Sequence, residues 1–293
     1  MHTRHGNDQA DGLRRLLVGG QTRLITVVGA KVGVGRTSMT LNLAAALANS
    51  GKDVVAVDEN QSPNNLVERL MLSPRTELLD VAQGRCELKQ VIQTVSGFSV
   101  LPAARVMRAL GRLNGSELQR LQHALTEASS CADILLVDAA SLGGDSATSS
   151  ALATGVSLLV VVDGTASGIT ETYTMIKKLA LENARLNFEI VVNRVHNDAE
   201  AINVFDNMAK VARRHLAARL EYLGYIPADA KLARANQLGR SVIDAFPASH
   251  SAQAYVELAQ RLSLQTADPN EARGGISGMV QSLVRQMRSE VIA

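Results

Sequence analysis

The chain of 293 residues is poor in aromatic side chains: it holds no tryptophan, four phenylalanines and four tyrosines, together 3% of the residues. Its apolar fraction is nevertheless an ordinary 46%. The core must therefore be built from alanine, valine and leucine, as buried parallel strands tend to be. Proteins that bind single-stranded nucleic acid stack the bases on aromatic rings. The scarcity of such rings argues against that class of function.

Cysteine and net charge are also low. Cys86 and Cys131 have neither a CxxC partner nor a histidine cluster beside them, so a disulfide framework or a zinc site is not expected. The formal net charge of +2 does not point to DNA or a membrane as a partner. No apolar run approaches the roughly 20 residues of a transmembrane helix. We expect a soluble, cytoplasmic protein that binds no nucleic acid.

Short β-branched runs recur along the chain, and helical patterns separate them. The runs are apolar throughout rather than alternating, which is typical of strands covered on both faces. Strand–helix alternation at this spacing predicts right-handed βαβ units. We therefore predict an α/β fold with a doubly wound, mostly parallel sheet flanked by helices on both faces. The expected strands are Leu24–Val28, Asp53–Val57, Phe98–Pro102, Ile134–Val137, Leu158–Val162, Glu189–Val192 and Glu221–Ile226.

Polar residues stand where four of these strands end, namely Asp58, Asp138, Asp163 and Asn193. Ligands of doubly wound sheets bind at the carboxyl ends of the strands. We expect the functional site to lie there.

A glycine-rich turn, Ala30 to Thr37, follows the first expected strand and leads into an apolar helical pattern. The backbone N–H groups of such a turn and of the helix N-terminus converge on one point, where an anion is favoured. Thr37 is placed to bind Mg²⁺. The pattern GxxxxGK[ST] is not matched literally, because Ala30 replaces its first glycine and Arg36 its lysine.

Lys31 indicates which variant of the motif this is. The order Lys31-x-Gly33-x-Gly35-Arg36-Thr37 resembles the deviant Walker A motif KGGxGKT of the MinD/ParA ATPases. In that family the early lysine reaches the nucleotide of the partner subunit. The resemblance implies a P-loop fold, ATP and Mg²⁺ as ligands, and a homodimer formed on ATP binding. The residues expected to hold the phosphates are Lys31, Gly33, Val34, Gly35, Arg36, Thr37 and Ser38.

Two positions of the loop depart from the family. Arg36 keeps the positive charge of the usual lysine, but its planar fork is not a compact ammonium. It could still hold phosphate bidentately. Val32 replaces a glycine, so the loop is strained if that position requires a positive φ.

The resemblance also assigns roles to residues at two strand ends. The family often has DxD at the position of Asp58, and the second aspartate orients or deprotonates the attacking water. Asn60 stands there, and loss of a general base commonly costs a factor of about 10² to 10⁴. Asp138 takes the place of the Walker B acid. The predicted metal-site residues are Thr37, Asp58 and Asp138, and the predicted catalytic residues are Lys31, Asn60 and Asp138.

Two further stretches match the family and concern the base. Val191-Val192-Asn193-Arg194 resembles its VNR motif, whose asparagine hydrogen-bonds adenine. Leu223 to Asp229 resembles its LGxIPxD ending. The resemblance therefore implies that Asn193, Pro227 and Asp229 help to bind the nucleotide.

Residues 1–21 precede the first strand and contain a segment that resembles the DQAxxLR motif of the flagellar MinD-like ATPases called FlhG or FleN. There the segment stimulates the GTPase FlhF. Its apolar residues fall on one stripe at helical spacing, and so short a helix is expected to order on a partner. The expected contacts with the partner are Asp8, Gln9, Ala10, Leu13, Arg14 and Leu17.

The other end carries a second amphipathic pattern. Residues 22–265 form the expected nucleotide-binding domain, residues 266–275 read as a linker, and residues 276–293 follow a helical apolar repeat. In MinD-like proteins such a helix binds the membrane. This one lacks an aromatic anchor and is weakly basic, so membrane contact should be weak unless dimerisation doubles it. Packing on its own domain or on a partner stays open. The apolar stripe is Ile276, Met279, Val280, Leu283, Val284 and Met287.

The resemblance as a whole implies a regulator of flagellar number and placement. It would bind ATP, act on an FlhF-like GTPase and on flagellar motor or transcription regulators, and reside in the cytoplasm or at the periphery of the inner membrane. Arg36 and Asn60 predict weak or lost ATP hydrolysis. A non-hydrolysing scaffold of the same family stays open, as does another MinD/ParA positioning ATPase for partition, division-site control or cellulose synthesis.

Overall fold

The computed structural model describes residues 22–61, 63, 65–140, 149–153, 156–182, 187–216, 218–265, 278–282 and 284. The predicted partner-binding segment, residues 1–21, lies outside the described residues. Within them, no helix is long and apolar enough to cross a bilayer.

The sheet has eight strands in the described part of the chain, in the order β3-β4-β2-β5-β1-β6-β7-β8. Every neighbouring pair is parallel except β3 and β4. The predicted α/β fold with a mostly parallel sheet is confirmed. The strands are β1 Arg23–Val28, β2 Val54–Asp58, β3 Gln93–Val95, β4 Phe98–Pro102, β5 Ile134–Asp138, β6 Ser157–Asp163, β7 Asn187–Val195 and β8 Arg219–Pro227.

The antiparallel strand β3 was not among the seven predicted strands. Its three residues are partly polar, and it joins β4 through Ser96 and Gly97, which both adopt a positive φ. A two-residue turn with positive φ at both positions matches the twist of a hairpin. So short a strand at the edge of the sheet leaves no apolar run to detect.

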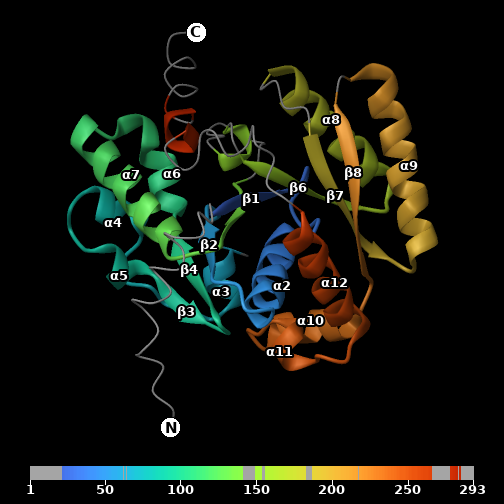
Figure 1. Ribbon diagram of the computed structural model, residues 1–293, viewed down its shortest axis with the longest axis horizontal. Helices are drawn as coiled ribbons and strands as arrows, with labels where there is room; N and C mark the ends of the chain where they lie inside the picture. Colours follow the sequence, from blue (N-terminus) through green and yellow to red (C-terminus); the bar gives the residue numbers. More distant parts are fainter. Residues whose placement is uncertain are drawn as a thin grey trace.

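Helices cover both faces of the sheet (Figure 1). Alternate residues of each central strand pack on opposite faces: Ile25 and Val27 lie in one core cluster, whereas Leu24 and Val28 lie in the other. The first cluster includes α2 Arg36–Asn49, α3 Leu66–Arg69, α10 Ala230–Gln237, α11 Val242–Ala245 and α12 His250–Leu264. The second includes α4 Leu78–Ala82, α5 Leu88–Val91, α6 Ala104–Ala109, α7 Gly115–Ser130, α8 Ala166–Glu182 and α9 Asp198–His215, with the 3₁₀ turns η1 Leu110–Arg112 and η2 Ser150–Leu152.

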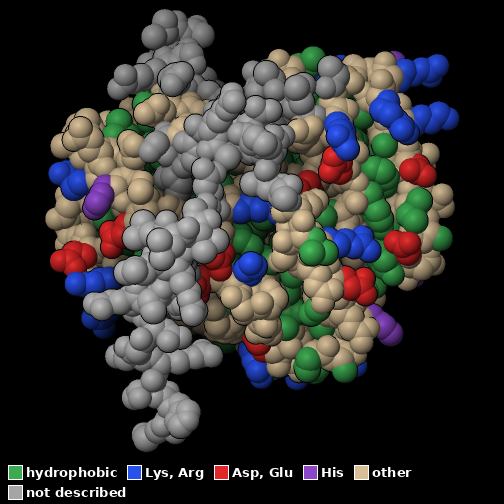
Figure 2. Space-filling view, viewed as in Figure 1, with side chains coloured by type: hydrophobic (Ala, Val, Ile, Leu, Met, Phe, Trp, Pro, Cys, Tyr) green, Lys and Arg blue, Asp and Glu red, His purple; other side chains and the backbone are tan. Residues whose placement is uncertain are grey.

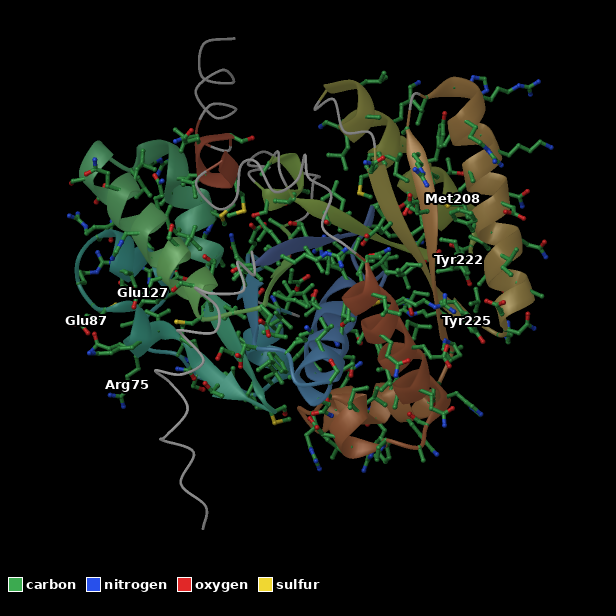
Figure 3. All side chains as sticks on the ribbon, in the orientation of Figure 1. Arg75, Glu87, Glu127, Met208, Tyr222 and Tyr225 are labelled. Carbon is green, nitrogen blue, oxygen red and sulfur yellow. The ribbon has the colours of Figure 1, made fainter. Side chains whose placement is uncertain are left out.

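The outer part of the sheet is joined to α9 by aromatic and polar contacts. The ring of Tyr222 on β8 lies 5.3 Å from that of Phe205 on α9. Its hydroxyl donates to Asp198 at 2.9 Å, and Figure 3 shows Tyr222 facing the helix that carries Met208. On the face seen in Figure 2, basic side chains gather at the upper end of α9 and acidic ones lie below them, because the first turn of this helix is acidic and its last turn is basic.

The described part of the C-terminal segment packs on the domain itself. Met279 and Val280 are 4% and 5% exposed and belong to the core cluster of α4, α6 and α7, where Figure 1 shows the segment beside α6. Val284 packs against the same cluster. Ile276, Leu283 and Met287 lie outside the described residues. The membrane, a partner protein and its own domain were the three surfaces that this amphipathic segment could contact. In the structure it contacts its own domain.

Candidate functional site

The phosphate loop connects β1 to α2 and depends on two glycines. Gly33 and Gly35 adopt φ values of 84° and 104°, which side chains rarely tolerate. A Cβ on Gly35 would collide with the side-chain amide of Asn193. Val32 does not adopt a positive φ, so the strain considered for this substitution is absent. Its side chain is 83% exposed at the tip of the loop.

A cleft of about 600 Å³ opens in front of this loop, at the carboxyl ends of the strands. The structure brings to it the predicted phosphate-binding residues, the residues predicted near the base, and Asn60. It also brings residues that were not predicted. The lining comprises Lys31, Val32, Gly33, Gly35, Arg36, Thr37, Ser38, Asn60, Gln61, Pro63, Arg69, Asn193, Arg194, Pro227, Ala228, Asp229, Leu232, Ala233 and Asn236. Val34 is buried behind the loop rather than facing the cleft.

Asn193 lies inside β7 rather than at its end, at a break in the register with β8. Its amide group donates to the carbonyl oxygen of Val34 at 2.7 Å, which fixes the side chain against the loop. Its Oδ1 is buried without a hydrogen-bond partner among the described residues, as is the Oδ1 of Asn236. Buried polar atoms are normally hydrogen-bonded. The two free acceptors therefore suit a ligand that carries N–H or O–H donors.

Asp229 is already engaged by the protein. Its carboxylate accepts from the N–H of Lys231 at 2.8 Å, and from the N–H and hydroxyl of Ser251 at 3.1 and 2.8 Å. Burial alone would raise the pKa of Asp229, but the hydrogen bonds from Ser251 and Lys231 hold it below its usual value. The residue caps α10 and contacts α12, so its part in the cleft is to hold the turn that follows Pro227, the last residue of β8.

Two carboxyl groups meet at the centre of the sheet. Asp58 and Asp138 are register partners on β2 and β5, and both are buried. Burial, and then the charge of Asp138, raise the pKa of Asp58 to about 7. Burial also raises the pKa of Asp138, against the charge of Arg36. Neither oxygen of Asp138 has a hydrogen-bond partner among the described residues. Buried carboxylate oxygens with the Thr37 hydroxyl beside them are ligands of the kind that Mg²⁺ prefers, but one of these oxygens already lies within ion-pair distance of Arg36.

Arg36 reaches this pair of carboxyl groups from the start of α2. Its Nε lies 3.4 Å from Oδ1 of Asp138, and its Nη2 donates to Oδ1 of Asn60 at 2.9 Å. The amide group of Asn60 donates in turn to the carbonyl oxygen of Asp138 at 2.9 Å. Arg36, Asn60 and Asp138 thus form one closed network.

Lys31 is paired within its own chain. Its Nζ lies 3.1 Å from Oδ2 of Asp163 and 3.5 Å from the hydroxyl of Ser167. Burial alone would raise the pKa of Asp163, but the Thr165 hydroxyl and the Lys31 ammonium hold it below its usual value. Asp163 was predicted at a strand end but was given no role. In the described chain it is the counter-ion of Lys31.

Glu59 is a further residue without a predicted role. Its side chain is buried, and its carboxylate accepts from the N–H of Ala140 at 2.9 Å and from the N–H of Ser150 at 3.2 Å. The hydroxyls of Ser149 and Ser150 also donate to it. It therefore joins the end of β2 to the residues on either side of segment 141–148. Burial raises the pKa of Glu59 despite these donors.

Arg69, the last residue of α3, also lines the cleft. It forms no ion pair with the described residues, and its Nε is buried without a hydrogen-bond partner. Burial lowers the pKa of this guanidinium. The position lies outside every motif, so only the fold could reveal that a free cation faces the cleft.

Comparison with known proteins agrees with this geometry. The model of the CobQ/CobB/MinD/ParA nucleotide binding domain matches residues 25–242. The antiactivator FleN of Pseudomonas aeruginosa is 35% identical over 90% of this chain and 94% of its own. The flagellum site-determining protein YlxH of Helicobacter pylori is 26% identical over 73% of each chain. The septum site-determining protein MinD of Pyrococcus horikoshii, solved with Mg-ADP, superposes with a TM-score of 0.61 at 21% identity, covering 83% of this chain and 97% of that one.

Proposed function

The chain belongs to the CobQ/CobB/MinD/ParA nucleotide binding domain family, and on this basis we propose that it is an ATP-dependent dimer switch that regulates flagellar number and placement. One observation carries the proposal: the phosphate loop and the two free amide acceptors line one cleft, and Arg36 of that lining contacts Asp138, the register partner of Asp58. In it, backbone N–H groups would hold the phosphates. The Oδ1 atoms of Asn193 and Asn236 would accept from the base or ribose.

A divalent cation would be held by Thr37 and Asp138, with the neighbouring Asp58, but only if Arg36 left the Asp138 carboxylate or shared it. Such an ion would supply positive charge that neutralises the phosphates. We assign hydrolysis a slow rate, because Asn60 cannot accept a proton from an attacking water. The carboxyl group of Asp58, whose pKa is raised to about 7, already accepts hydrogen bonds from the backbone N–H groups of Asn60 and Val67.

The flagellar part of the proposal is supported by sequence. FleN is named an antiactivator and YlxH a flagellum site-determining protein, and residues 8–17 match the DQAxxLR pattern. The proposed partners are therefore an FlhF-like GTPase, bound through that segment, and flagellar motor or transcription regulators. The proposed location is the cytoplasm, with membrane contact only if the C-terminal segment leaves its place on the domain.

The dimer is tested by sedimentation velocity with ATP, with ADP and without nucleotide. We expect a dimer with ATP alone, and a monomer under all conditions for Lys31→Ala. A chain that binds ATP but stays monomeric at saturation contradicts the switch. The partner is tested separately: removal of residues 1–21 should abolish stimulation of an FlhF-like GTPase while ATP affinity is unchanged. Stimulation that survives the deletion contradicts the flagellar assignment.

A further inference from the structure

Within the cleft, the Arg36 side chain is held between Asn60 and Asp138. It is only 12% exposed, and its guanidinium spans the gap between the Asn60 amide oxygen at 2.9 Å and the Asp138 carboxylate at 3.4 Å. Asn60 is itself fixed, since its backbone N–H donates to Asp58 at 3.1 Å and its carbonyl oxygen accepts from Asn65 at 3.2 Å. The guanidinium is thus positioned by a rigid acceptor.

An amide suits position 60 better than a carboxylate does while Arg36 is present. Asn60 uses its oxygen as an acceptor for Arg36 and its NH₂ group as a donor to the carbonyl oxygen of Asp138. A carboxylate has no donor, so one of its oxygens would face that carbonyl oxygen. It would also add a third acidic group beside Asp58 and Asp138. The arginine and the asparagine are therefore matched to each other.

The guanidinium also occupies the carboxylate that a divalent cation needs. Arg36 is the one cation of the described residues within ion-pair distance of Asp138, whose oxygens are buried and otherwise free. A metal ion bound to the same carboxylate would have to displace the guanidinium or share the site with it. Two cations in so small a buried volume repel each other.

We propose that Arg36, held by Asn60, is the resident counter-ion of Asp138 and takes the place of the divalent cation, so that the chain binds nucleoside triphosphate with little dependence on Mg²⁺. The inference rests on the proposed nucleotide site. Arg36 lines the cleft, although its Nε is buried against Asp138. The same guanidinium can therefore face phosphate oxygens on one side and Asn60 on the other, as a planar fork allows.

The test is the dissociation constant of a fluorescent, non-hydrolysable ATP analogue, measured in excess Mg²⁺ and in EDTA. For the natural chain we expect the two constants to agree within about threefold. The double variant R36K/N60D restores the residue types usual in the family. We expect its affinity to fall at least tenfold in EDTA, within the range of coupling between residues in direct contact. Titration of Mn²⁺ into the complex, followed by electron paramagnetic resonance, should show a bound ion for the double variant only.

A matched control makes the same two changes of residue type elsewhere. R213K/N197D alters an exposed arginine of α9 and the asparagine that caps this helix, where aspartate serves equally. It should behave as the natural chain does. A tenfold or greater loss of affinity in EDTA for the natural chain overturns the inference, and that comparison needs no variant to fold. Absence of binding in both buffers would instead refute the proposed nucleotide site.

Discussion

The ion pair between Lys31 and Asp163 opposes dimerisation, because breaking it requires a free energy that can be measured. If Lys31 is to reach the nucleotide of a partner subunit, it must leave Asp163, 3.1 Å away in its own chain. The two side chains are 29% and 9% exposed, and a partly exposed pair contributes about 0.5–1 kcal/mol. A symmetric dimer breaks two such pairs, about 1–2 kcal/mol in all. Because 1.4 kcal/mol corresponds to a factor of ten, Asp163→Asn should tighten ATP-dependent dimerisation about 5- to 30-fold.

The substitution is mild, since asparagine keeps an oxygen that can accept from the N–H of Thr165, as Asp163 does at 3.2 Å. The assay is sedimentation velocity over a concentration series with saturating ATP. Asp206→Asn is the control, because it removes the same charge from an exposed position on α9. A dimer of unchanged or lower affinity in Asp163→Asn would show that the pair does not oppose association, or that Lys31 does not cross.

Three further perturbations follow from the structure. Burial raises the pKa of Glu59 above its usual value, so the folded chain holds that proton more tightly than the unfolded chain and loses stability as the pH rises above the pKa of the unfolded chain. Glu59→Gln should flatten the fall of the urea midpoint between acidic and neutral pH, and an unchanged slope would contradict the assignment. Arg69→Gln should weaken ATP about tenfold or more, as loss of a hydrogen bond to a charged group does. The control is Arg75→Gln, which changes an exposed arginine that is labelled in Figure 3. It should leave the affinity for ATP, measured by fluorescence titration, unchanged. Equal losses of affinity in the two variants would refute a role for Arg69. Met279→Ala should cost the C-terminal segment about 2 kcal/mol of packing and speed hydrogen exchange at residues 278–282, whereas unchanged exchange would show that this side chain does not hold the segment.

The fold could be predicted because it is encoded in local, repeated patterns. Strands covered on both faces are apolar in every position, so runs such as Ile134–Val137 are visible without any long-range information. The phosphate loop is also encoded by a local pattern, since its glycines, Gly33 and Gly35, lie close together in the sequence. β3 was missed because a three-residue edge strand has too few buried positions to form a pattern.

Much of the cleft could not be predicted, because its remaining contacts join residues far apart in the chain. No sequence pattern near Glu59 predicts that its carboxylate will accept hydrogen bonds from Ala140 and Ser150. The sequence marks Arg36 and Asn60 as departures from the family motifs, but it does not show that their side chains are in contact. Only the sheet, which places β2 beside β5 and the phosphate loop above both, shows that the two substitutions contact each other.

Nucleotide binding at the phosphate loop is the central property of the proposed switch, and two glycines allow a direct test of it. Gly35 and Gly51 both adopt a positive φ, but a Cβ would collide with Asn193 at the first and meet nothing within 4 Å at the second. The measurement is a calorimetric titration of ATP into the natural chain, Gly35→Ala and Gly51→Ala. We predict saturable binding, one ATP per chain, by the natural chain and Gly51→Ala, and loss of binding by Gly35→Ala. Absence of binding by the natural chain, or equal binding by all three, would contradict it.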